Sequence, residues 1–189
     1  MTGLGQTDNY RASELHETGQ RRADQTMASG LGSNCNCTMA VIRVLMRIEQ
    51  LEGVQVGLST SLEVMEDAEV RCFAVLSCPI CRQRRFSLAS VTVISATVTE
   101  WVRRTWLGGS IDNDVLLGDI HLDRADAEML SRELMTLQLS HFVRVMTRLE
   151  TTLSAASSVH TVGYQDIVRS KLQELHDCKD QIHKLSLSG

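Results

Sequence analysis

The sequence predicts an all-α protein, with about five amphipathic helices in a single bundle-like domain and a disordered N-terminal arm. Apolar residues recur every three to four positions over long stretches, which is typical of helices with one buried face. The 189-residue chain has one proline, Pro79, whereas sheet-rich folds need more turn residues. A hydrophobic fraction of 43% is too high for disorder of the whole chain.

The arm is predicted over residues 1–34 and the helical domain over residues 35–189. The arm is rich in Gly, Ser, Thr, Asn and Gln, and it has too little apolar surface to offset the entropy of ordering. It lacks the hydrophobic core of a signal peptide. No apolar stretch approaches the roughly 18 residues of a membrane span. We therefore expect an intracellular chain without a membrane segment.

The first two helices are predicted over Cys37–Leu51 and Leu58–Ser77. Each carries apolar residues at helical spacing. Gly53 is a suitable stop for the first helix. Ser59 or Ser61 is a candidate N-cap for the second, and acidic residues in its early turns favour a helix start.

The third segment, Phe86–Leu107, fits two structures. Its run SVTVISATVTEW is β-branched and partly alternating, which favours a strand. The segment nevertheless continues for roughly 20 residues without Gly or Pro, which is long for a strand. An apolar stripe at helical spacing is formed by Leu88, Val91, Ile94, Val98 and Trp101. We favour the helix.

A loop, GGSIDNDVLLGDIHLD, separates this segment from two further helices. Asp123 is predicted to cap a helix that runs to about Leu153. The anchors of that helix are expected to be Leu130, Leu134, Leu137, Val145 and Leu149. After the interruption SAASSVHTVG, the last helix is predicted from about Tyr164 to Leu185. Its buried face is expected to hold Ile167, Leu172, Leu175, Cys178, Ile182 and Leu185.

Six cysteines in an intracellular chain are expected to be reduced thiols or metal ligands. Cys78 and Cys81 have the Cys-x2-Cys spacing that lets two thiolates share one zinc ion. Cys35 and Cys37 are separated by one residue. If the first two helices pack antiparallel, the two pairs meet at one pole and form a candidate zinc site. The alternative, which we favour at this stage, is small buried residues at helix ends and no cofactor.

Two arginine clusters, RQRR at residues 82–85 and RRTW at residues 103–106, could form a phosphate-binding patch together with Arg71. Solvated helix ends are the favoured interpretation. The net charge of −4 argues against a polyanion binder as a whole. An aromatic content of 4% argues against a platform for stacking bases.

Catalytic signatures are missing from the sequence, which has no Gly-x-Ser-x-Gly elbow, P-loop or dinucleotide fingerprint. Acid–base chemistry on a hydrophobic intermediate in the bundle core is an alternative function. The acids that could supply it are Glu63, Glu66, Asp67 and Glu100. Solvated helix faces explain these acids more simply, so we lean away from an enzyme and assign no catalytic residue.

The order of these elements resembles the C-terminal domain of fungal aflatoxin-regulatory-type transcription factors. The resemblance is carried by Cys-x-Cys before an apolar helix, by a second apolar helix that ends in VLSCPIC, and by another apolar helix after it. The stretch LLGDIHLDRADAEMLSRELMTLQLSHFVRVMTRLETTL is also similar to that family. The resemblance covers about residues 33–187.

The resemblance implies a nuclear regulator of a secondary-metabolite gene cluster. Such factors usually carry an N-terminal zinc binuclear cluster of cysteines and basic residues. Here no cysteine precedes Cys35, and the only basic side chains before it are Arg11, Arg21 and Arg22. We therefore expect regulation through a protein partner or a homo-oligomer, without direct sequence-specific DNA binding.

Overall fold

The computed structural model describes residues 35–107, 116–117, 120–156 and 159–187. Its five α-helices are α2 (Cys37–Gln50), α3 (Leu58–Ser77), α4 (Arg85–Val102), α5 (Arg124–Ala155) and α6 (Val159–Leu187). They belong to one compact unit that begins at Asn36. The predicted all-α class is confirmed. The predicted arm, residues 1–34, lies outside the described residues.

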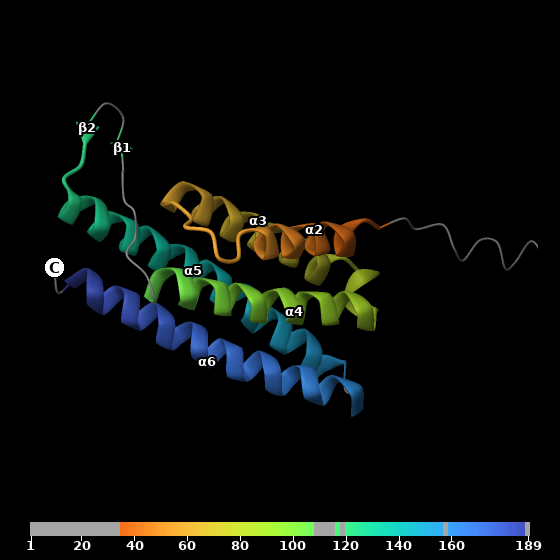
Figure 1. Ribbon diagram of the computed structural model, residues 1–189. Coiled ribbons are helices and arrows are strands. Elements are labelled where there is room, and N and C mark those ends of the chain that lie inside the picture. Colours follow the sequence, from red (N-terminus) through yellow and green to blue (C-terminus); the bar gives the residue numbers. More distant parts are fainter. Residues whose placement is uncertain (1–34, 108–115, 118–119, 157–158, 188–189) are drawn as a thin grey trace, which may run out of the picture. The chain divides into compact units, whose positions relative to one another are not determined.

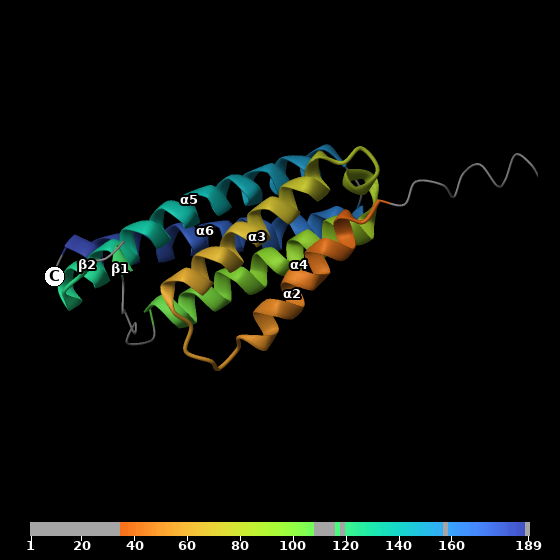
Figure 2. The same cartoon turned by 90° about the horizontal axis from the view of Figure 1, so that it is seen from above.

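Helix α4 is the centre of this unit, because it contacts α2, α3, α5 and α6. The two longest helices, α5 and α6, lie side by side along their length (Figure 1). On the other side of α4, α2 packs against α3 and α4 (Figure 2). None of the described helices combines the length and the hydropathy needed to cross a membrane.

The third predicted segment is a helix, as favoured, and a single π-helical turn extends α4 over Arg103–Leu107. Contact with four other helices buries most of the surface of α4, including several Ser and Thr residues. The buried hydroxyls of Thr92, Ser95 and Thr99 donate to the carbonyl oxygens of Leu88, Val91 and Ser95, at 3.0, 2.8 and 2.8 Å. Burial of an unpaired hydroxyl is costly, so these bonds within the helix make α4 compatible with the core.

The helix starts differ in part from prediction. Asp123 is the N-cap of α5, as predicted, and its Oδ1 accepts a hydrogen bond from the backbone N of Asp126 at 2.9 Å. Neither Ser59 nor Ser61 caps α3, because the cap position belongs to Gly57. Ser61 lies in the core, and its Oγ donates to the Gly57 carbonyl oxygen at 3.0 Å.

The described parts of the predicted loop and of the predicted interruption include regular secondary structure. Within the loop, β1 (Leu116–Leu117) pairs antiparallel with β2 (Ile120–His121), so that Leu116 lies opposite His121. Helix α6 begins at Val159 and not at Tyr164. Its first turns include Thr161, which is 5% exposed, so packing of this end offsets the weak helix propensity of the segment.

The buried stripe of α5 was predicted correctly only in its second half, where Val145 and Leu149 are buried. Leu130 and Leu134 are half-buried, and Leu137 is 56% exposed. The first half buries a neighbouring stripe: Ala127, Ser131, Met135, Leu139 and Phe142. Two stripes of similar spacing coexist on this helix, and packing against α3 and α6 selects the one with the small residues.

The face predicted for α6 is confirmed for its central residues. Leu175, Cys178 and Ile182 are buried. Ile167 and Leu185, at the two ends of the predicted face, are 45% and 42% exposed, and Leu172 is half-buried. At these ends the buried residues are Val168 and Ser186, so the buried face is shifted by one residue and the apolar side chains of Ile167 and Leu185 remain exposed.

These burial patterns predict a large difference between two neighbouring leucines of α5. We expect Leu139→Ala to lower the free energy of unfolding by about 2–5 kcal/mol, because it opens a cavity in the core. The control Leu137→Ala should cost less than about 1 kcal/mol, since half of that side chain is already in water. Urea unfolding monitored by circular dichroism measures both. Equal losses would contradict the packing of α5 described above.

Candidate metal centre

Four of the six cysteines form a cluster at one pole of the helical unit. Cys35, Cys37, Cys78 and Cys81 each offer a sulfur atom, and these four atoms all lie within 4.8 Å of one another. The cysteine pairs that the sequence singled out are therefore brought together. Cys81 is buried and the other three are partly exposed.

The helix ends place these thiols. Cys37 is the first residue of α2, and Cys35 lies two residues before it in the sequence. Cys78 is the C-cap of α3, and Cys81 opens a 3-10 turn over Cys81–Gln83. Because α2 and α3 pack antiparallel, the start of α2 lies beside the turn that joins α3 to α4 (Figure 2).

A buried hydrogen-bond chain fixes the inner side of the cluster. The Thr38 Oγ1 donates to the Cys81 Sγ at 3.8 Å and lies 2.8 Å from the Ser87 Oγ. Cys81 and Ser87 are each 1% exposed, so this chain joins the first turn of α2 to the first turn of α4 behind the thiols. Partners of this kind orient metal ligands. Sequence reasoning missed Thr38 and Ser87, because their proximity depends on helix packing.

The remaining two cysteines are core residues outside the cluster. Cys72 is buried in the middle of α3, and burial raises the pKa of its thiol far above the usual range. Burial likewise raises the pKa of the Cys178 thiol to about 11, and Arg103 offsets this only in part. Both thiols are protonated near neutral pH, so neither resembles a metal ligand or a nucleophile.

A tetrahedron of four thiolates is the chemistry that this donor set fits best. Four sulfur atoms bound about 2.3 Å from a single zinc ion lie about 3.8 Å from one another. The four sulfur atoms here, all within 4.8 Å of one another, need only small movements to reach that distance. A [4Fe–4S] cluster spreads its thiolates further apart, because each binds a different iron. Calcium and magnesium prefer oxygen ligands, which the cluster does not offer.

The acids considered for catalysis lie on helix surfaces. Glu63 pairs with Arg47 at 3.1 Å, and Asp67 pairs with Arg71 at 2.9 Å. Glu100 lies 2.7 Å from Arg103. The hydrogen bond from Arg47 lowers the pKa of Glu63, and the one from Arg103 lowers the pKa of Glu100. Glu66 is exposed. A general acid at neutral pH needs a raised pKa, so these carboxylates fit solvated faces better.

Comparison of the chain with protein-family models, with curated proteins and with solved structures finds no match. The regulatory function implied by the sequence pattern therefore remains a proposal. The geometry of the described residues carries the functional inference below.

The contrast between partly exposed and buried cysteines predicts two classes of alkylation. At pH 8, iodoacetamide should modify the three partly exposed cluster thiols, Cys35, Cys37 and Cys78, of metal-free native protein. It should leave Cys72, Cys81 and Cys178 unmodified, since burial shields these side chains. Reaction at Cys178 should accelerate as the pH approaches about 11, because its thiolate fraction rises. Peptide mass mapping measures each site, and denatured protein is the control in which all six cysteines react.

Proposed function

We propose that the chain is a zinc-stabilised helical domain that regulates transcription through protein contacts. The observation that carries the zinc part is the convergence of four thiols within 4.8 Å. Cys35, Cys37, Cys78 and Cys81 would hold the ion. Four protein ligands fill a tetrahedral coordination sphere, so the zinc has no open position for a substrate and its role is structural.

The electrostatic surroundings suit a group of thiolates with a net negative charge. Four thiolates and one zinc ion carry a net charge of about −2. Cys37 stands at the start of α2, where the helix dipole favours a negative sulfur. The helix dipole therefore offsets part of the charge of the thiolates.

The position of the cluster explains why an ion would stabilise the fold. Helix α2 is at the edge of the unit and packs only against α3 and α4 among the described helices. A metal bound at the start of α2 and at the turn after α3 closes the chain across the first two helices. Such closure restricts the unfolded chain, and the binding free energy of the ion becomes folding free energy.

We expect the purified protein, equilibrated with zinc and dialysed, to retain one zinc ion per chain. When free zinc is present at about 1,000 times its Kd, its removal should lower the free energy of unfolding by about 4 kcal/mol. For a domain of this size, that corresponds to a fall in Tm of about 8–16 °C. Atomic emission spectrometry measures the metal, and a thermal melt with and without a chelator measures the stability.

Cys78→Ser should abolish retention of zinc and remove the effect of the chelator on Tm. Cys178→Ala is the matched control, because it changes a buried cysteine outside the cluster. That variant should melt at a lower temperature and still retain zinc. Protein that binds no zinc at equilibrium, or a Cys78→Ser variant that retains it, would refute the proposed site.

The regulatory part of the proposal rests on the resemblance of the cysteine elements and the Leu-rich helix to the aflatoxin-regulatory-type domain. The resemblance supports a nuclear transcription regulator or co-regulator of a fungal secondary-metabolite gene cluster. Exposed apolar side chains on α6 suit a contact with a protein partner or a second copy. Val162, Ile167 and Leu185 are 53%, 45% and 42% exposed.

Deletion of the gene that encodes this chain should reduce the transcripts of the regulated gene cluster. It should also reduce all the metabolites that this gene cluster produces. Complementation with the Cys178→Ala variant should restore both, whereas Cys78→Ser should not, because its domain is destabilised. Transcript and metabolite profiles of the same strains measure this. Accumulation of one intermediate with intact transcripts would instead identify the alternative, a biosynthetic enzyme that acts on a hydrophobic compound.

A further inference from the structure

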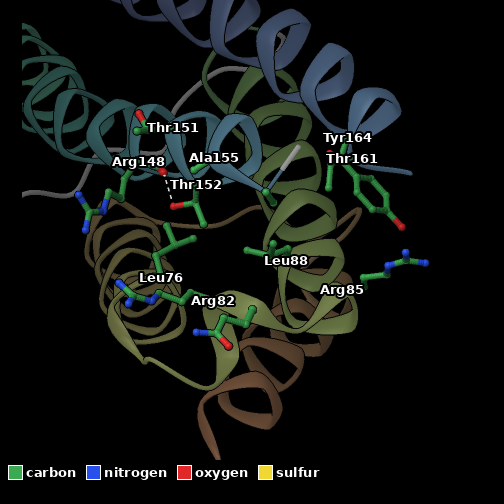
Figure 3. A pocket seen from close by; sticks show the side chains of 12 residues that line it. Leu76, Arg82, Arg85, Leu88, Arg148, Thr151, Thr152, Ala155, Thr161 and Tyr164 are labelled. Atoms are coloured by element: carbon green, nitrogen blue, oxygen red, sulfur yellow. Dashed lines mark hydrogen bonds between the residues drawn. The ribbon is translucent and has the colours of Figure 1, made fainter. Parts of the chain in front are cut away.

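A cavity of about 570 Å³ lies where the ends of four helices meet, close in sequence to the thiol cluster (Figure 3). Its walls come from the end of α3, the start of α4, the end of α5 and the start of α6. The lining includes Leu76, Arg82, Arg85, Leu88, Arg148, Thr152, Ala155, Thr161 and Tyr164. Its volume is within the range of about 300–1,000 Å³ that is typical of small-molecule sites.

The interior of the cavity is apolar and its rim is basic. Leu76 and Leu88 extend into it from α3 and α4, and both are almost completely buried. Arg82 and Arg148 lie on one side of the cavity (Figure 3). Arg85 lies on the opposite side with Tyr164. A molecule that fills the cavity would therefore meet hydrocarbon in the middle and guanidinium groups at the edge.

These arginines differ from most others in the described part of the chain. Six arginines form ion pairs with carboxylates: Arg47, Arg71, Arg103, Arg104, Arg132 and Arg169. Within the same described residues, Arg82, Arg85 and Arg148 have no ion pair, and the cavity lining contains no carboxylate. The positive charge at the cavity is therefore not neutralised by the protein.

The start of α4 adds to this positive potential. Arg85 is its first residue, no side chain caps that end, and its first turn has no acidic residue. The N-terminus of a helix carries a partial positive charge, which favours an anion nearby. Guanidinium groups bind carboxylates and similar oxyanions through paired hydrogen bonds.

The basic patch for phosphate that the sequence suggested takes a different form. Arg71, Arg103 and Arg104 are engaged by Asp67, Glu100 and Glu52. The RQRR cluster supplies two of its arginines to an open cavity whose lining is mainly apolar. A nucleic acid backbone needs an extended basic surface, whereas this cavity suits a compact molecule.

We propose that this cavity is a binding site for a small organic anion with an apolar body, such as an aromatic or aliphatic carboxylate. The apolar body lies against Leu76 and Leu88, and the anionic group is bound by Arg82 and Arg148. This site goes beyond the proposed regulatory function and gives the domain a way to respond to a small molecule.

The test uses anilinonaphthalene sulfonate, a fluorescent anion with an apolar body, and its uncharged analogue N-phenylnaphthylamine. All measurements use protein saturated with zinc, because Arg82 follows Cys81 directly in the chain. Differences in zinc content then do not change the conformation of the turn that carries Arg82. We expect the anion to bind at one site per chain. The double variant Arg82→Gln/Arg148→Gln should bind it about tenfold or more weakly, because it lacks two charge-assisted hydrogen bonds. Binding of the uncharged analogue should change by less than about twofold.

Two further variants separate this site from general dye binding. Arg144→Gln is the matched control, because Arg144 is exposed on α5 one turn before Arg148 and does not line the cavity. It should leave the affinity unchanged. Ala155→Trp should fill the cavity and abolish binding of both dyes while the circular dichroism stays helical. Binding of the anion that neither the double variant nor Ala155→Trp weakens would overturn the proposal.

Discussion

The burial of most of α4 is the constraint on which the rest of the structure depends. A helix that contacts four others has little surface left for water, so each of its polar groups needs a partner within the protein. The hydroxyls of Thr92, Ser95 and Thr99 meet this need by bonding to the carbonyl oxygens one turn earlier. The segment can therefore be rich in Ser and Thr and still form the core.

The central position of α4 also decides where chemistry can occur. Its start lies at the pole where α2 begins and α3 ends, and both candidate sites are at that pole. The turn between α3 and α4 carries Cys81, whose sulfur accepts a hydrogen bond from Thr38 beside Ser87. Arg82 and Arg85 line the cavity. A single short segment thus links a candidate structural ion to a candidate ligand site.

The sequence indicated that the four thiols could converge, although it favoured no cofactor there, and it gave no sign of the cavity. Two cysteine pairs at the ends of consecutive helices must meet if those helices pack antiparallel, and local spacing was sufficient to see this. The cavity needs Arg148 from the end of α5 and Thr161 from the start of α6 beside Arg82. No local pattern joins these residues. The first turns of α6 form one wall of the cavity. Their weak helix propensity led the sequence to predict a later start for this helix.

By itself the sequence determined the helical class, the approximate limits of the helices, the Asp123 cap and the two cysteine pairs, because periodicity, capping and ligand spacing act over a few residues. Tertiary structure alone decided which stripe of α5 is buried. Leu137 and Leu139 are the same residue type in similar local sequence. Only contacts with the neighbouring helices determine that Leu139 is buried and Leu137 is exposed. For the β-branched segment the sequence favoured a helix without excluding a strand, and contacts with four other helices stabilise the helical form.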